Sequence, residues 1–296
     1  MRTTRSTSAR LVWAAAAAAL LLGADASQPA LHAQPAADRN GAIPDFSSNR
    51  MTWVLMNGTA YFKVSGDTGP GPIMQAGREY KHDEVPRIAD TSNPILQPWA
   101  KKLMDEENAK VLAGGIPYYP TSRCWPGGVP GLLLFPGEPV VFAQTPNEVW
   151  ILYQRDAQVR RVYLNVPHSK NPHYSWYGES VGHYENGDTL VIDTIGLADK
   201  GKRGPIDRFR TPHTDRLHVI ERYRLNNGGK NIEVSFTVED PGTFTMPWKA
   251  KVDFQRGSGA RSGDWSESIC ADNPIDYFAD DKPGAVPVPR ADKPDF

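Results

Sequence analysis

Short segments in which apolar and polar residues alternate dominate the second half of the chain. Alternation places every second side chain on the same side of an extended strand, so each segment predicts a strand with one face in a core. Turn residues separate the segments at short intervals, which favours an antiparallel meander over alternating strands and helices. The predicted strands are Pro139–Gln144, Glu148–Tyr153, Val159–Leu164, Glu179–Glu185, Thr189–Ile195, Arg216–Leu225, Ile232–Val238 and Pro247–Phe254.

The clearest turn is Asn186-Gly187, which joins two of these segments. Asn-Gly favours the positive φ angles of a type I′ turn, the preferred connection of a tight hairpin. A second turn is predicted at Asn226-Asn227-Gly228-Gly229. About eight strands suffice to close a small barrel around one ligand. We predict a mainly β fold over residues 136–280, a meander forming a lipocalin-like closed or partly closed barrel, with a sandwich as the alternative.

The rest of the chain has a different texture. Residues 49–135 predict an irregular arm with one helix at about 94–111, which begins after Asn93-Pro94 and should pack on a larger body. The segments 27–48 and 281–296 are rich in Pro and in small or charged residues and predict poor order. The apolar positions that recur at helical spacing are Leu96, Trp99, Leu103 and Met104.

The N-terminus has the pattern of a secretory signal peptide. Three arginines precede an apolar run, Leu11–Gly23, of about 13 residues, whereas a membrane span needs roughly 20. Small residues permit cleavage after Ala26, which makes 1–26 the leader, or alternatively after Ala33. We therefore expect a periplasmic or secreted protein without stable membrane insertion.

Composition limits the partners. The chain carries 33 basic and 34 acidic residues, a net charge of -1, and no basic stripe, so we do not expect nucleic acid as a partner. Aromatic residues make up 10%, enough for a substantial core. No phosphate-binding or dinucleotide fingerprint is present, and we expect no cofactor. The oligomeric state is not readable from the sequence.

The chain has two cysteines, Cys124 and Cys270. Two are too few for a four-thiolate zinc site, which leaves one disulfide or two free thiols. In an oxidising compartment a disulfide is the simpler outcome, and closing so long a loop stabilises a protein by about 4–5 kcal/mol. A nucleophilic or metal-bound thiolate is the alternative, but Cys124 lies in a turn-like Trp-Pro-Gly context.

Five blocks in the centre of the chain carry a recognisable pattern: Tyr177–Thr194, Pro212–Asp215, Val219–Tyr223, Asp240–Pro241 with Thr243–Trp248, and Val159–Tyr163. In these blocks the chain resembles a large family of exported bacterial proteins, most of them without an assigned activity. The signature of that family reads close to G-x-S-V-G-R-W-E-G-D-T-L-V-V-D-T. The resemblance covers roughly residues 120–273 and implies an exported, β-rich protein, but it brings no activity with it.

The departures from the family pattern gather around one hairpin. His183 stands where arginine is usual, Tyr184 where tryptophan is usual, and Asn186 is inserted in the turn. Asn165-Val166-Pro167-His168 replaces a D-G-R-x-H-P segment. These changes indicate either a member specialised for its own substrate or drift.

Candidate acid–base residues lie on the central strands. Five histidines, His168, His173, His183, His213 and His218, fall within a short stretch, and histidine exchanges protons near neutral pH. Alternation puts His183 and Glu185 on one strand face. Glu221 lies among apolar neighbours, where it either has a raised pKa and acts as an acid or base, or pairs with Arg160 or Arg161.

Further residues complete the predicted site. Asp193 or Asp215 would orient a histidine, and His213 belongs to the same set. Although His213, Asp215 and His218 are potential metal ligands, no H-E-x-x-H or C-x-x-C spacing occurs and we expect no metal. Arginines would meet an anionic group of the ligand, and aromatic residues would form a wall against it. These ligand-binding candidates are Arg161, Arg222, His173, Tyr174, Trp176, Tyr177 and Trp248.

Together these features predict an exported protein that holds a small apolar, aromatic or sugar-like molecule in a barrel cavity. An enzyme of this kind would be a metal-free lyase, hydratase or isomerase in which His183 and Glu221 transfer protons. The alternatives are a non-catalytic carrier and a structural envelope protein. A serine hydrolase is not expected, because Gly178-Glu179-Ser180-Val181-Gly182 lies in a strand that enters a hairpin, whereas a nucleophile elbow joins a strand to a helix.

Overall fold

The computed structural model describes residues 43–47, 52–56, 63–64, 88–89, 91–114, 124–133, 139–199, 204–207, 209–257 and 267–270. The predicted leader 1–26, both cleavage positions and the predicted tail 281–296 lie outside the described residues.

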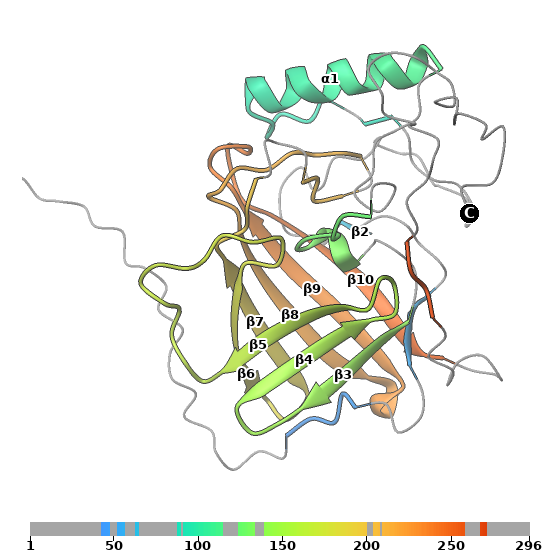
Figure 1. The fold of residues 1–296 in the computed structure, drawn as a ribbon, viewed down its shortest axis with the longest axis vertical. Helices are drawn as coiled ribbons and strands as arrows, with labels where there is room; N and C mark the ends of the chain where they lie inside the picture. Colours follow the sequence, from blue (N-terminus) through green and yellow to red (C-terminus); the bar gives the residue numbers. More distant parts are fainter. Residues whose placement is uncertain are drawn as a thin grey trace, which may run out of the picture. The chain divides into compact units, whose positions relative to one another are not determined.

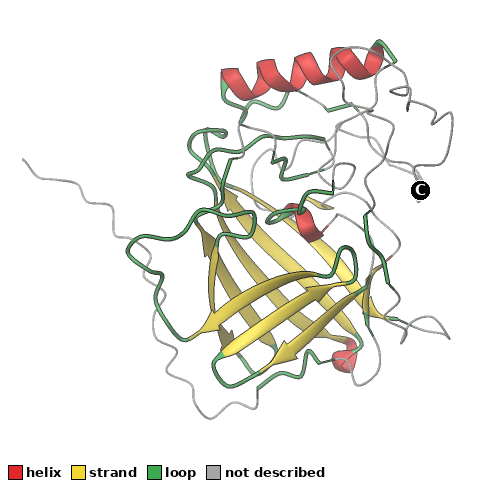
Figure 2. Ribbon diagram, viewed as in Figure 1, coloured by secondary structure: helices red, strands yellow, loops and turns green. Residues whose placement is uncertain are grey.

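Within the described residues the fold is mainly β and is built around a closed, nine-stranded mixed barrel, with one α-helix (Figure 1; Figure 2). This agrees with the predicted lipocalin-like architecture at the level of a closed barrel. All eight predicted strands are present, with ends that differ by at most two residues. They are β3 (Val140–Gln144), β4 (Glu148–Tyr153), β5 (Gln158–Leu164), β6 (Glu179–Glu185), β7 (Thr189–Ile195), β8 (His218–Asn226), β9 (Asn231–Glu239) and β10 (Trp248–Arg256).

The ninth strand comes from the N-terminal arm. β1 (Trp53–Leu55) pairs with the end of β10 and, through Trp53 opposite Val140, with β3, which closes the barrel. β2 (Lys63–Val64) adds to the same edge of β10 further along. The division into an irregular arm at 49–135 and a barrel at 136–280 is therefore wrong at β1. Three residues are too few to show a pattern, so only the pairing partners identify this strand.

The wall departs from an antiparallel meander at β5 and β6. These strands run parallel, with Val162 opposite Ser180, so the prediction of antiparallel pairing is wrong at this pair. Parallel neighbours cannot be joined by a tight turn and need a crossover of about a dozen residues or more. The crossover loop, residues 165–178, makes this connection, and near its end Ser175 pairs with Leu197 beyond β7.

Both predicted turns are present. Asn186 and Gly187 have φ angles of 53° and 71°, as a type I′ turn requires, and β6 and β7 pair on either side of them along their whole length. The second turn forms a short 3-10 turn, Asn227–Gly229, between β8 and β9.

The barrel interior is filled by alternate residues of each strand. On β9 the four inward side chains, Ile232, Val234, Phe236 and Val238, are at most 2% exposed. Phe46 joins this core, 5.7 Å from Phe142, and its carbonyl accepts a hydrogen bond from Trp53 Nε1 at 2.8 Å. The prediction of poor order for residues 27–48 is therefore wrong for 43–47, where buried Phe46 and hydrogen bonds with the Gln144 side chain anchor the chain.

The helix α1 (Pro98–Leu112) begins later than the predicted start at about 94. Before it, Leu96 forms a β-bridge with Phe244, and Gln97 N donates to Thr243 O at 2.8 Å. Proline suits the first turn of a helix and disfavours helical geometry in the residue before it, which places the start at Pro98. As predicted, the helix packs on a larger body, through Ala100, Met104 and Asn108. No helix within the described ranges is long and apolar enough to cross a membrane.

Cys124 and Cys270 form a disulfide with a Cα–Cα distance of 5.4 Å across a sequence separation of 146. The predicted pairing is confirmed. The disulfide joins the segment between β1 and β3 to the segment 267–270 after β10, which also pairs with the wall through a bridge between Arg155 and Ser268.

Candidate functional site

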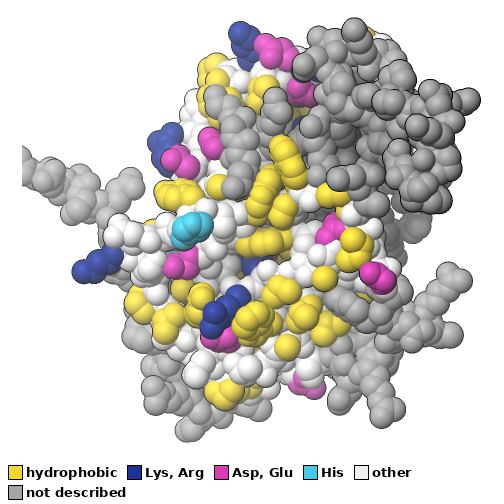
Figure 3. Space-filling view, viewed as in Figure 1, with side chains coloured by type: hydrophobic (Ala, Val, Ile, Leu, Met, Phe, Trp, Pro, Cys, Tyr) yellow, Lys and Arg dark blue, Asp and Glu magenta, His cyan; other side chains and the backbone are white. Residues whose placement is uncertain are grey.

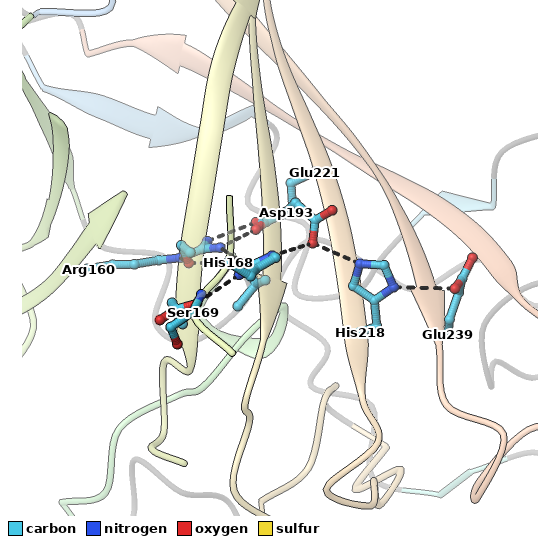
Figure 4. A network of polar contacts seen from close by, with 10 residues as sticks. Arg160, His168, Ser169, Asp193, His218, Glu221 and Glu239 are labelled. Carbon is cyan, nitrogen blue, oxygen red and sulfur yellow. Dashed lines mark hydrogen bonds and ion pairs between the residues drawn. The ribbon is translucent and has the colours of Figure 1, made fainter. Parts of the chain in front are cut away.

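A polar cluster is enclosed in the barrel interior, centred on Arg160 of β5 and Glu221 of β8. Arg160 is 2% exposed and Glu221 is fully buried. Arg160 Nη1 and Nη2 donate to the two carboxylate oxygens of Glu221 at 3.1 and 2.5 Å (Figure 4). Glu221 was predicted either to act as an acid or base or to pair with Arg160 or Arg161, and in the structure it pairs with Arg160.

The remaining atoms of this cluster are also hydrogen-bonded. Arg160 donates to Ser180 Oγ at 3.1 Å and to Thr194 Oγ1 at 2.7 Å, and Tyr223 OH donates to Glu221 at 3.0 Å. Burial opposes the charge of Arg160, but the adjacent Glu221 raises the pKa of this guanidinium above its usual range. A buried pair with saturated partners holds strands together and leaves no donor or acceptor for a ligand.

Little space is left beside this cluster. The interior cavity bordered by Phe142, Tyr153 and Tyr223 encloses about 10 Å³. A cavity of that volume holds about one water molecule. A ligand site must therefore be sought elsewhere on the barrel.

A second polar network lies on the outer face of the wall and links five residues (Figure 4). His168 Nδ1 is 3.0 Å from Glu179 Oε1, and His168 Nε2 is 3.0 Å from Asp193 Oδ1. The same Asp193 oxygen is 2.8 Å from His218 Nε2, and His218 Nδ1 is 3.3 Å from Glu239 Oε2. We call this alternating chain of carboxylates and imidazoles the histidine network.

Strand register explains how the histidine network forms. Asp193, His218 and Glu239 are outward-facing residues of the adjacent strands β7, β8 and β9, and His218 lies directly opposite Glu239. His168 comes from the crossover loop, which exists because β5 and β6 are parallel. Ser169 N in this loop also donates to Glu179 at 2.7 Å. The loop is thus held against the wall by polar contacts.

Both imidazoles of the network contact carboxylates through both ring nitrogens. A neutral imidazole has one N–H, so only the protonated ring can donate at both positions. Burial acts to lower the pKa of His168 and His218, but the hydrogen bonds and negative charges around them raise both above the ordinary 6.5. The contacts with both imidazoles, working against burial, hold the pKa of Asp193 well below its ordinary value. Hydrogen bonds from Ser169, together with the contact to His168, lower the pKa of Glu179 against its burial.

A pocket of about 340 Å³ lies at the Glu239 end of the histidine network. Small-molecule sites usually enclose about 300–1,000 Å³ and combine apolar walls with a few polar groups. This rim pocket has that character, because proline, phenylalanine and methionine side chains of the loop after β9 face His218 and Glu239. Its lining residues are Arg216, His218, Glu239, Asp240, Pro241, Phe244, Thr245, Met246 and Pro247.

Asp240 fixes the shape of the loop that borders the rim pocket. Its carboxylate accepts hydrogen bonds from Thr214 N and Thr214 Oγ1, both at 2.6 Å, from Gly242 N at 2.9 Å and from Thr243 Oγ1 at 2.8 Å. The pocket wall is therefore preorganised by a buried side chain.

The predicted catalytic pair does not meet. His183 shares a strand face with Glu185, as the alternation predicted, and its Nε2 lies 2.8 Å from Glu185 Oε1. That face points outward, whereas Glu221 faces inward. The two cannot act on one bound molecule, because the barrel wall separates them. Asp193 does orient histidines, as one prediction had it, but they are His168 and His218.

His213 and Asp215 also lie apart from the histidine network. His213 is buried, its Nδ1 donates to the Thr214 carbonyl at 2.8 Å, and burial lowers its pKa. Asp215 is exposed. Within the described part of the chain, no group of three or more His, Cys, Asp or Glu side chains is placed to hold a metal ion.

The two arginines predicted to bind a ligand are paired on the outer surface. Arg222 contacts Glu185, and Arg161 contacts Glu148 with its guanidinium 4.5 Å from the ring centre of Tyr163. On the face shown in Figure 3, hydrophobic and charged side chains are mixed over β3–β5, as expected for positions that face solvent.

The predicted aromatic wall is not one surface. His173 and Tyr174 are exposed on the crossover loop. Trp176 packs 5.6 Å from Trp125, and Tyr177 donates to Gln158. Trp248 is buried, 5.8 Å from Phe244.

Sequence reasoning did not single out Glu179, Glu239 or Arg216 for the site. Glu239 could have been found from the hairpin register, which sets it opposite His218. The position of His168 depends on the crossover, for which the sequence carries no signal.

The chain matches no protein-family model, and no curated protein matches it significantly in sequence. The resemblance to the exported bacterial family stays a prediction, and the function is argued from the site.

Proposed function

We propose that this protein binds a small organic molecule in the rim pocket. The observation that carries the proposal is the position of His218, which lines a 340 Å³ pocket with apolar walls and is held there by Asp193. A histidine that a carboxylate fixes at one nitrogen, and whose contact at the other nitrogen a ligand can replace, is a common arrangement in binding and catalytic sites. The proposed site differs from the interior cavity expected from the sequence.

The contact between His218 and Glu239 is the one a ligand would replace. At 3.3 Å it is the longest in the histidine network, and the Glu239 side chain is 37% exposed. If Glu239 turns toward solvent, His218 Nδ1 can donate its hydrogen bond to a ligand oxygen, while Asp193 keeps the ring in place. The raised pKa of His218 keeps the proton available near neutral pH.

In the enzyme form of the proposal His218 is a proton donor. A lyase, hydratase or isomerase requires such a group and no cofactor beyond it. In the carrier form the same hydrogen bond orients the ligand without turnover. An envelope protein without a ligand is the third alternative, because the interior cluster and the histidine network are each saturated by internal hydrogen bonds.

The proposed location is the periplasm or the exterior, following export by the leader 1–26. The Cys124–Cys270 disulfide supports this proposal, because disulfides persist in oxidising compartments.

The test is a metabolite screen on the purified mature protein. The protein is incubated with a mixture of small organic acids, phenols and sugars, and retained or consumed compounds are identified by mass spectrometry. His218→Gln should weaken retention, whereas His183→Gln should not, because His183 is an outward histidine with a carboxylate partner that does not line the pocket.

The outcomes separate the three forms. Consumption that His218→Gln abolishes supports the enzyme, and retention without consumption supports the carrier. If the wild-type protein retains and consumes nothing, and His218→Gln lowers only the melting temperature, the proposal is overturned in favour of a structural role.

A further inference from the structure

The charged groups of the rim pocket are not equally engaged. Asp240 is saturated by its hydrogen bonds to the surrounding loop, and Glu239 is paired with His218. Arg216 lies just before β8, and within the described residues its guanidinium has neither a hydrogen bond nor an ion pair. Five N–H donors are therefore unused at the edge of the pocket.

Arg216 lies against the loop that borders the rim pocket. A Cβ atom built on Gly242 would lie 2.9 Å from Arg216 Nη2, so the guanidinium rests against the backbone of the loop that forms the pocket wall. The pocket lining thus combines apolar side chains, such as Phe244 and Met246, with a guanidinium.

We infer that the rim pocket takes an organic anion, with an apolar body against Phe244 and Met246 and an acidic group bound by Arg216. The inference rests on the proposed function and names the class of its ligand. Guanidinium groups bind carboxylates through two parallel hydrogen bonds, which neutral groups cannot match. A cationic ligand would find only carboxylates that already have donors.

The ligand's acidic group also explains the opening of the His218–Glu239 contact. An anion bound by Arg216 in the pocket that Glu239 also lines would repel this partly exposed carboxylate toward solvent. His218 Nδ1 then faces the ligand. Arg216 and His218, two residues apart on the chain, would hold the acidic group and a second polar atom of the same molecule.

The test uses three charge forms of one scaffold: 2-naphthylacetate, its primary amide, and the corresponding 2-naphthylethylammonium ion. Each is titrated at up to millimolar concentration into the full mature protein, and the backbone amide signals of Thr245 and Met246 are followed by NMR. We expect the carboxylate to bind about tenfold more tightly than the amide, and the ammonium ion more weakly than either.

Arg216→Met should remove the preference for the carboxylate and leave binding of the amide unchanged. Arg224→Met is the matched control, because Arg224 is an exposed arginine of β8 that pairs with Glu233 at 3.0 Å and does not line the pocket. It should preserve the preference.

Equal affinity for carboxylate and amide, or an unchanged preference in Arg216→Met, overturns the inference but leaves a binding pocket in place. If none of the three probes shifts the two signals, the inference and the proposed binding function both fail.

Discussion

His218 Nε2 lies 2.8 Å from Asp193 Oδ1, and the same oxygen is 3.0 Å from His168 Nε2. A single carboxylate oxygen therefore joins two imidazoles, one from β8 and one from the crossover loop. Asp193 is the residue on which both the attachment of this loop and the orientation of His218 at the rim pocket depend.

Asp193→Asn should lower the free energy of unfolding by about 2–3 kcal/mol, because two hydrogen bonds to a charged group are weakened. The pKa of His168 and His218 should fall toward 6.5, since the amide lacks the charge that raises them. Urea unfolding measures the first effect and NMR titration of the ring protons the second.

Asp215→Asn is the control for this change. Asp215 is an exposed carboxylate on the turn that leads into β8, so its removal should alter stability by less than about 0.5 kcal/mol. Equal effects of the two substitutions would contradict a central role for Asp193.

The histidine network should stabilise the fold most between about pH 4.5 and 6.5. Because His168 and His218 have folded-state pKa values above 6.5, their contribution is complete below pH 6.5 and is lost as the pH rises through those values. Asp193 and Glu179 have lowered pKa values, so their contribution is present above about pH 4.5 and is lost as the pH falls through the folded values.

The measurement is the difference in unfolding free energy between the wild type and His168→Gln/His218→Gln from pH 4 to pH 9. The lowered pKa of buried His213 and the raised pKa of buried Asp207 affect both proteins alike and cancel in this difference. A difference that stays constant above pH 6.5 would show that the rings are not charged in the folded protein.

The buried pair of Arg160 and Glu221 gives a different kind of prediction. Arg160→Met or Glu221→Leu alone should cost about 3–5 kcal/mol, because each leaves a buried charge without its partner. Arg160→Met/Glu221→Leu should recover most of that loss, since no charge remains and Ser180 and Thr194 still bond each other at 2.9 Å. Additive losses in a double-mutant cycle would contradict the pairing.

The fold was predictable where local alternation decides it. β6 and β7 have the predicted bounds, because a Gly-containing turn and period-two patterning act within a few residues. β1 and the parallel β5–β6 pair were not predictable, since both depend on partners distant in sequence. The same division applies to the site.

Alternation correctly placed His183 and Glu185 on one strand face, but it did not decide which face points into the barrel, and the structure has His183 outward and Glu221 inward. What alternation cannot supply is the partner across the barrel or across the crossover. The sequence predicted Arg160 only as one of two possible partners of Glu221. The contact of His168 with Asp193 forms because the crossover loop folds back over the outer face of the wall, which the sequence did not predict.

Removing the disulfide should destabilise the protein without changing the barrel. Cys124→Ser/Cys270→Ser opens a loop of 146 residues, for which loop-closure entropy predicts a loss of about 4–5 kcal/mol. Thermal unfolding measures the loss, and intact-mass analysis after alkylation without reductant counts the thiols. Two alkylated thiols in the native wild-type protein would refute the disulfide.

Gly178, the last residue of the crossover loop before β6, lies close to the backbone at the end of β7. Its φ is 59°, and a Cβ atom there would lie 2.2 Å from the Ile195 carbonyl oxygen, so Gly178→Ala combines an unfavourable φ with a backbone clash. We expect a loss of about 2–4 kcal/mol in unfolding free energy.

Gly228→Ala is the matched control, because Gly228 has a φ of 62° but no atom within 4 Å of its Cβ position. This substitution should lower the unfolding free energy by only about 1 kcal/mol, the cost of placing a residue with a Cβ atom at a positive φ. Equal losses of unfolding free energy at the two positions would mean that the backbone around Gly178 moves to accept a Cβ atom. The crossover loop would then pack less tightly on β7 than the contact with the Ile195 carbonyl implies.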